Sequence, residues 1–168
     1  MTDRFVAILL TSFTCAVAGQ ASPSNRGAVP GACALLSQRE VEEAAGMPVR
    51  EGVPLLRSGV PSSCAFIAER LVRLTVLLRP VPTAEWASEQ VVRMTRGVHL
   101  GTYREVPGIG DRSFLYEMRQ SGAVLCVFES GYYLEFSLAS PGLESRAPAV
   151  LERLARSALA RLAPATSR

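Results

Sequence analysis

The four cysteines are the residues of this chain with the most distinctive chemistry, and their positions favour a structural disulfide. Cys15 falls in an apolar N-terminal run that we expect to be removed on export, which leaves three thiols. A bond between Cys33 and Cys64 would close a loop of about thirty residues and stabilise the fold by on the order of 3–4 kcal/mol. Cys126 lies in the run AVLCVF, where we expect it to be buried and reduced. The pairing Cys64–Cys126 remains open from the sequence alone.

The chain lacks the usual partners for metal binding and nucleophilic catalysis. His99 is the only histidine, there is no Cys-x-x-Cys pair, and the cysteines are too scattered to complete a zinc site with one histidine. All eighteen basic residues are arginines, so Schiff-base lysine chemistry and a P-loop lysine are excluded. We therefore predict no catalytic residue, no bound metal and no cofactor.

The segment Pro107–Phe114, with the sequence PGIGDRSF, is the most distinctive loop. Glycine-rich loops can cradle phosphate, but this one lacks the GxGxxG spacing and leads into a predicted strand rather than a helix. Gly108 and Gly110 are better explained as residues of a tight turn with positive φ, and Asp111 as a side chain that bonds back onto that turn. The loop is therefore predicted to be structural.

Side chains on the predicted strands are the remaining candidates for a binding site. Glu117, Glu129 and Glu135 sit on successive strands, and we expect them to form an outward, solvated row. A ligand pocket on the sheet would draw on three tyrosines and one arginine: Tyr103, Tyr116, Tyr132 and Arg119. The aromatic run YYLEF holds one glutamate and no arginine, which argues against a base-stacking platform for nucleic acid.

Length and composition are those of a single globular domain. The 168 residues are 48% hydrophobic and 20% charged, which separates the chain from disordered sequences. The net charge is +3, and the arginines are spread along the sequence among the glutamates, so no patch for nucleic acid is indicated.

The N-terminus has the pattern of an export signal. Arg4 precedes the apolar run Phe5–Ala18, and small residues allow cleavage after Ala18 or Ala21. The run is about fourteen residues long, shorter than the roughly twenty that span a bilayer, so no stable transmembrane anchor is expected. The three residues before Cys15 are a poor lipobox, which makes lipid attachment at this cysteine the less favoured alternative.

These patterns divide the chain into four parts. Residues 1–21 are assigned to a signal peptide and residues 22–31, rich in proline, glycine and serine, to a flexible linker. Residues 32–163 form the predicted domain, and residues 164–168 a short tail.

Alternating helical and strand patterns predict an α+β domain. Ser37 and Glu40 form a capping box that starts a helix over Gln38–Ala45, and Gly46 ends it. Further helices are predicted over 84–96 and 143–162. Strands are predicted over 47–56, 63–69, 72–79, 102–106, 113–119, 123–129 and 132–138. Short turns between strands indicate an antiparallel sheet with helices packed on one face, and the order of elements suggests a faint α-β-β-β repeat.

Four segments carry a family resemblance: CALLSQREVEEAAGMPV, SSCAF, VPGIGDRSFLY and the closing helix rich in alanine and leucine. Together, over about residues 32–162, they resemble small exported envelope proteins and lipoproteins of actinobacteria of the DUF3558 type. The resemblance implies a disulfide-stapled α+β domain in the cell envelope, with no catalytic residues to carry over. The matching residues are structural: Cys33, Cys64, Gly108, Gly110 and Asp111. The chain departs from the lipoprotein members at the lipobox, which puts membrane anchoring in doubt.

Composition, motifs and resemblance together predict a non-catalytic protein that is exported to the periplasm or secreted. We expect it to bind a small ligand or an envelope protein through its sheet or its loops. The alternative is an accessory or inhibitory subunit of an envelope complex. An enzyme is less favoured because the usual catalytic sets are incomplete.

Overall fold

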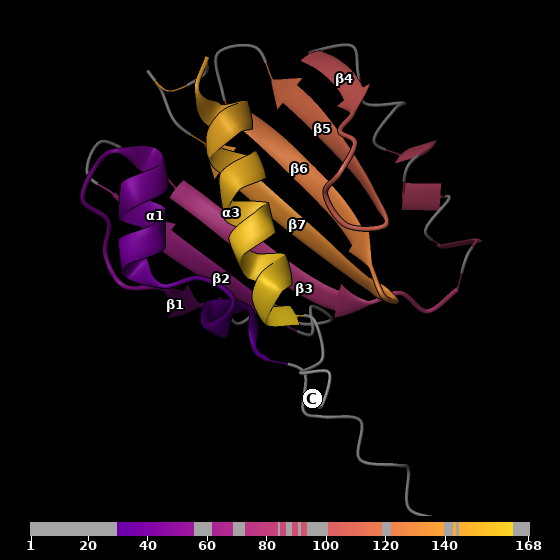
Figure 1. Ribbon diagram of the computed structural model, residues 1–168, viewed down its shortest axis with the longest axis horizontal. Coiled ribbons are helices and arrows are strands. Elements are labelled where there is room, and N and C mark those ends of the chain that lie inside the picture. Colours follow the sequence, from indigo (N-terminus) through magenta and orange to yellow (C-terminus); the bar gives the residue numbers. More distant parts are fainter. Residues whose placement is uncertain are drawn as a thin grey trace, which may run out of the picture.

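The computed structural model describes residues 30–55, 62–68, 73–83, 85–86, 89–90, 92–93, 101–118, 122–139, 143 and 145–162. They form a seven-stranded antiparallel sheet with helices packed against it, which confirms the α+β prediction (Figure 1). The helices are η1 (Ala32–Ala34), α1 (Gln38–Ala45) and α3 (Ala147–Leu162). The strands are β1 (Val53–Pro54), β2 (Ser62–Ile67), β3 (Arg73–Pro80), β4 (Gly101–Glu105), β5 (Arg112–Met118), β6 (Gly122–Glu129) and β7 (Tyr132–Ala139).

Two meanders build the sheet, whose strand order is β1-β2-β3-β7-β6-β5-β4. The first runs β1 to β3 and the second β4 to β7, and they join where β3 pairs with β7 over eight residues, from Arg73↔Ala139 to Pro80↔Tyr132. The first meander follows α1, and the second follows described helical residues between 85 and 93. The second unit therefore has four strands where the predicted repeat has three.

Helix α1 begins and ends as its sequence predicts. The Ser37 hydroxyl accepts a hydrogen bond from the Glu40 amide, while the Glu40 carboxylate accepts one from the Ser37 amide at 2.8 Å. Gly46 closes the helix with φ +71°, a left-handed conformation that glycine adopts without strain. These local signals place the first helix without help from the rest of the fold.

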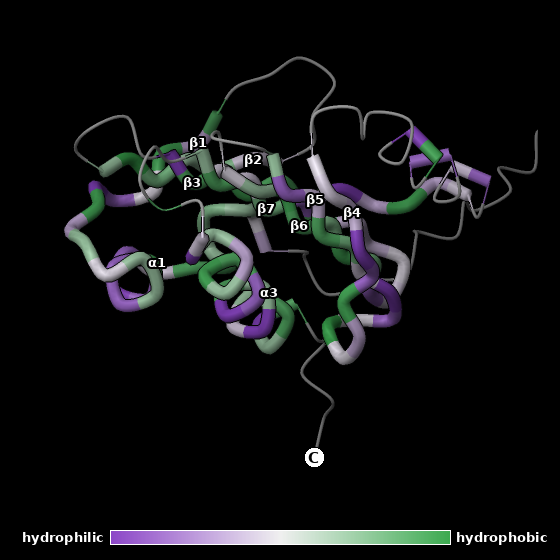
Figure 2. Tube along the Cα trace, turned by 90° about the horizontal axis from the view of Figure 1, so that it is seen from above, coloured by the Kyte–Doolittle hydropathy of each residue, from purple (hydrophilic) through white to green (hydrophobic). Residues whose placement is uncertain are grey.

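Helices α1 and α3 lie side by side on the same face of the sheet, which we call the helix side (Figure 2). α3 packs on β6 and β7, and its buried residues recur at helical spacing. It begins at Ala147 instead of the predicted residue 143, and in the turn before it the Leu143 carbonyl accepts from the Arg146 and Ala147 amides. Leu143 is nevertheless buried in the core.

The main core lies between the helix side of the sheet and the two helices. Strands contribute every second residue to it, as the predicted alternation requires. The contributors from β3, β7 and β6 are Leu74, Val76, Leu78, Leu134, Phe136, Leu138, Ala123, Leu125 and Val127. The opposite face, which we call the outer face, carries the alternate residues of the same strands.

The predicted strand over 47–56 is much shorter in the structure. Of the described residues 47–55, only Val53–Pro54 forms a strand, and Val49 makes an isolated bridge to Ala68. Two prolines in this segment have no amide hydrogen to donate, and Gly52 lies so close to Phe66 and Cys64 that a side chain there would collide with both. The result is a short, irregular edge strand.

The predicted signal peptide, most of the linker, the C-terminal tail, Cys15 and His99 lie outside the described residues. Within the described part of the chain, no helix is long and apolar enough to cross a membrane.

Candidate functional site

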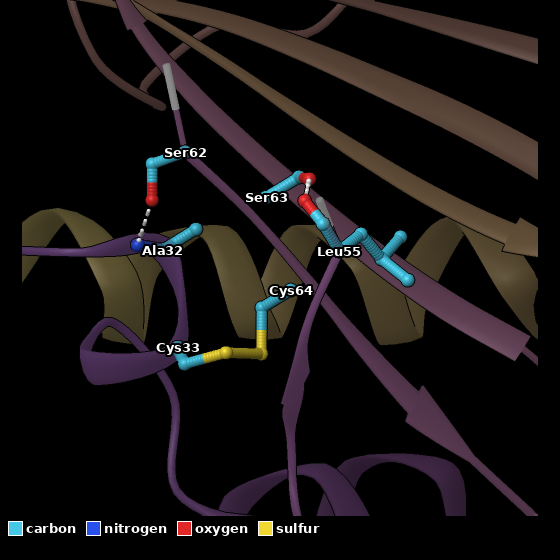
Figure 3. The surroundings of a disulfide bond; sticks show 6 residues. All are labelled: Ala32, Cys33, Leu55, Ser62, Ser63 and Cys64. Atoms are coloured by element: carbon cyan, nitrogen blue, oxygen red, sulfur yellow. Dashed lines mark hydrogen bonds between the residues drawn. A yellow bond between two sulfur atoms is a disulfide. The ribbon is translucent and has the colours of Figure 1, made fainter. Parts of the chain in front are cut away.

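The disulfide joins Cys33 of η1 to Cys64 of β2, with Cα atoms 5.0 Å apart and a sequence separation of 31 (Figure 3). This confirms the favoured pairing over Cys64–Cys126. The Ala32 amide donates to Ser62 Oγ at 2.6 Å beside the bond, and Ser63 Oγ donates to the Leu55 carbonyl at 2.9 Å. The start of the domain is therefore tied to the sheet by a covalent bond and by a hydrogen bond.

The loop before β5 has the structural role that its glycines predict. Gly108 and Gly110 have φ of +77° and +64°, and a Cβ at Gly110 would come within 2.7 Å of the Phe128 carbonyl oxygen. Asp111 does not bond back onto its own turn: its Oδ2 accepts from the Ser130 amide at 2.8 Å. The carboxylate therefore ties this loop to the hairpin turn between β6 and β7.

The structure brings together only some of the predicted pocket residues. Tyr103 and Tyr116 are directly opposite each other on β4 and β5, on the outer face. Tyr132 lies on the helix side and packs against the main core, so it cannot share a pocket with them. Arg119 lies outside the described residues.

The three strand glutamates do not form the expected row. In the strand register, Glu135 is directly opposite Cys126 on the outer face. Glu117 is opposite Ala123 and so lies on the helix side. Glu129 is opposite Tyr132, also on the helix side. The register of β5, β6 and β7 decides this, because a shift of one residue moves a side chain to the other face.

A cluster of five rings on the outer face is the most distinctive group of side chains there. Contacts between ring centroids run in a row, at 5.4, 5.3, 6.5 and 5.5 Å. We call these residues, in that order, the aromatic cluster: Trp86, Tyr133, Phe128, Phe114 and Tyr103. Phe114 and Tyr133 are buried, while the other three rings are half-exposed. Trp86 therefore covers part of the outer face.

Two arginines lie over rings of the aromatic cluster. The Arg79 guanidinium carbon is 4.0 Å from the centroid of Trp86, and that of Arg112 is 4.6 Å from Phe114. Arg112 is also paired with Glu105 at 3.2 Å. Among the described residues, Arg79 has no carboxylate partner. The guanidinium N–H groups of Arg79 could therefore donate hydrogen bonds to a bound anion.

Beneath the rings, a chain of hydrogen bonds runs from a buried thiol to a half-exposed carboxylate. Tyr133 Oη donates to Glu135 Oε2 at 2.8 Å and lies 3.1 Å from Cys126 Sγ. Because the phenol has a single proton and gives it to Glu135, the thiol must be the donor to Tyr133. All three polar groups are thereby satisfied.

Burial raises the pKa of the Cys126 thiol to about 12. Burial, together with the nearby Cys126 and Glu135, also raises the pKa of Tyr133. Both groups are therefore protonated at neutral pH. A protonated, buried thiol is a poor nucleophile, so this hydrogen-bonded chain does not resemble an activated cysteine site.

Reasoning from the sequence missed Trp86 and Arg79 as partners. The available signal was local: Arg79 alternates with the core residues of its strand, and Pro80 and Pro82 break that strand just before the single tryptophan. A chain that turns back after the break returns Trp86 to the face on which Arg79 lies. Phe114 and Phe128 were placed on strands, but their meeting depends on the register of β5 and β6.

Within the described ranges, no group of three histidine, cysteine, aspartate or glutamate side chains could hold a metal ion. Comparison with known proteins finds no family model that matches the chain and no curated protein similar to it.

Proposed function

We propose that this chain is a non-catalytic binding module exported to the bacterial cell envelope, and that its aromatic cluster binds a small aromatic anion. The observation that carries the proposal is Arg79, which lies over Trp86 at 4.0 Å and has no carboxylate partner in the described part of the chain. Half-exposed Trp86 and Phe128 offer ring surface beside this cation. An aromatic anion would use both, stacking on the rings while its acidic group accepts from Arg79.

The absence of catalysis rests on the chemistry of the cluster. Beneath the rings, the Cys126 thiol is buried and protonated, and the Glu135 carboxylate accepts a hydrogen bond from the Tyr133 hydroxyl. Neither group is poised to attack a substrate or to exchange a proton with one.

Export is supported by the N-terminal pattern, by the resemblance to envelope proteins and by the disulfide, which persists in oxidising compartments. A mass spectrum of the chain recovered from its own envelope tests this part. We expect a chain that starts at Gly19 or Ser22 and is two hydrogens lighter than its reduced form. A full-length chain recovered from the cytoplasm with free thiols would contradict export.

The ligand site can be tested with anilinonaphthalene sulfonate, a small aromatic anion, because Trp86 is the only tryptophan and reports on the cluster directly. We expect saturable quenching of Trp86 fluorescence by energy transfer to the probe. Arg79→Gln should weaken binding about tenfold or more, since a charge-assisted bond is lost.

Arg73→Gln is the matched control, because Arg73 lies on the same strand and the same face but makes no contact with the cluster. It should bind the probe like the parent chain. Equal binding by the parent and Arg79→Gln would overturn the site, and so would equal losses in both variants. Unchanged thermal unfolding of both variants would show that the probe is not reporting a loosened fold.

A further inference from the structure

The corner of the outer face farthest from β4 exposes large apolar side chains. Val53 on β1 and Ile67 on β2 are 54% and 38% exposed, while most large aliphatic side chains of the described sheet are buried. Val53 is opposite Ala65 on β2, two residues before Ile67, so both apolar side chains lie on the same face and close together.

Two arginines flank this apolar pair. Arg73 on β3 is directly opposite Ile67. On the other side of Ile67, the Arg50 amide donates to the Ile67 carbonyl at 2.8 Å. Val49 points into the core, so alternation places the exposed Arg50 on the outer face. We call these four residues the basic-apolar corner: Arg50, Val53, Ile67 and Arg73.

No described carboxylate neutralises the arginines of this corner. Among the described residues, neither Arg50 nor Arg73 has an ion pair, although Glu51 lies next to Arg50 in sequence and is also exposed. On the helix side the pattern is reversed, because five arginines there pair with glutamates: Arg39, Arg104, Arg153, Arg156 and Arg161. The corner therefore combines unpaired positive charge with exposed aliphatic surface.

We infer that the basic-apolar corner docks on a membrane surface that contains anionic phospholipid. The backbones of Arg50 and Arg73 flank Ile67 on either side, about 9–10 Å apart by strand spacing. This separation lets each bind the phosphate of a different lipid, in the bidentate geometry that arginine favours. Val53 and Ile67 then enter the boundary between headgroups and acyl chains, as the apolar residues of interfacial proteins do.

The basic-apolar corner shares no residue with the aromatic cluster, so a negative result for one surface does not contradict the other. Both surfaces lie on the outer face, however. A chain docked by this corner would keep its helix side, with α1 and α3, directed away from the bilayer (Figure 2).

The test is co-sedimentation of the full chain with vesicles of phosphatidylcholine alone and of phosphatidylcholine mixed with phosphatidylglycerol. We expect tighter binding to the anionic vesicles and a loss of that difference at high salt. Arg73→Gln should lower binding to the anionic vesicles about fivefold, because it removes the attraction of one basic residue to the anionic surface. Removing both arginines, with Arg50→Gln and Arg73→Gln together, should lower it about 25-fold. Ile67→Ser should weaken binding to the anionic vesicles as well.

Arg39→Gln is the matched control, since Arg39 is an exposed arginine on α1 and its loss changes the net charge equally. It should leave vesicle binding within about twofold of the parent. Any contribution of the apolar N-terminal run is common to all variants and to the neutral vesicles, so the comparison isolates the corner.

Equal binding to neutral and anionic vesicles would overturn the inference, and so would equal losses from Arg39→Gln and Arg73→Gln. A dimer in the native mass spectrum that Arg73→Gln dissociates would also overturn it, because the corner would then serve a second copy of the chain.

Discussion

Carboxylates pair with five arginines on the helix side of the sheet. On the outer face, Arg79 and Arg112 lie over aromatic rings, and of these two only Arg112 also has a carboxylate partner among the described residues. Arg161 of α3 donates to the Leu35 carbonyl at 2.7 Å and to Glu40 at 2.8 Å, which joins α3 to the start of α1. On the outer face, Arg79 lies over Trp86 instead. Exposed ion pairs contribute about 0–1 kcal/mol each, so the helix-side pairs mainly orient the two helices.

The two faces also differ in how completely they bury their large residues. Phe136 and Leu125 on the helix side are inaccessible to solvent, beneath α3. On the outer face Phe114 and Tyr133 are buried, but Phe128, which contacts both, is half-exposed. The difference suggests that the helix side supplies most of the stability of the fold, while the outer face keeps rings and cations available for binding.

Truncating one phenylalanine on each face tests this division and should give the largest effects. We expect Phe136→Ala to lower the free energy of unfolding by about 3–5 kcal/mol, because it leaves a cavity in the main core. Phe128→Ala should cost about 1–2 kcal/mol, since its ring is only half-buried. Urea unfolding followed by circular dichroism measures both losses. Equal losses would mean that the outer face is packed as firmly as the core.

Removing the disulfide should have the next largest effect. Cys33→Ser frees η1 from β2 and should destabilise the chain by about 2–4 kcal/mol, because the unfolded chain regains the freedom of the closed loop. Thermal unfolding with and without reductant measures it. Reductant should lower the melting temperature of the parent to that of Cys33→Ser and leave the variant unchanged. A melting temperature of the parent chain that does not change with reductant would contradict the stabilising role of the disulfide.

Acid should weaken the contact between α1 and α3 by a smaller amount. Partial burial opposes ionisation of Glu40, but hydrogen bonds from Ser37 and Arg161 outweigh it and lower the pKa to about 2. The folded pKa lies below the ordinary value of 4.5, so this stabilisation is present above about pH 4.5 and is lost as the pH falls towards 2. Glu40→Gln should therefore cost about 1 kcal/mol at pH 7.

Urea unfolding at pH 7 and near pH 2 measures this effect, and the two chains should converge at the acidic end. Glu43→Gln is the control, because Glu43 pairs with Arg39 and Arg153 at an exposed site and should change stability by only a few tenths of a kcal/mol. A constant difference between Glu40→Gln and the parent across this pH range would contradict the role of the charge.

Local signals predicted much of the fold. The capping box of Ser37 and Glu40 located α1, and alternation on β3 and β7 identified which residues enter the core. The prediction failed over 47–56, where Pro48, Gly52 and Pro54 left a two-residue strand. Alternation in hydrophobicity reports burial, but it does not report whether a partner strand is available for hydrogen bonding.

The candidate site was harder to predict because its members are distant in sequence. Tyr103 and Tyr116 were among the predicted pocket residues and do share the outer face, whereas Tyr132 does not. Trp86 and Arg79 were not predicted to meet. Each outcome depends on register between strands, since a shift of one residue moves a side chain to the opposite face.

The sequence by itself determined both ends of α1, the core-facing residues and a favoured disulfide partner for Cys33, because each follows from short-range periodicity, capping or cysteine position. Only the tertiary structure decided that β3 pairs with β7, and with it the contents of each face. That pairing joins residues about sixty positions apart, whose contact depends on the packing of both meanders on α1 and α3. Local sequence preferences do not specify such a long-range contact, and the outer face that it creates holds both proposed binding surfaces.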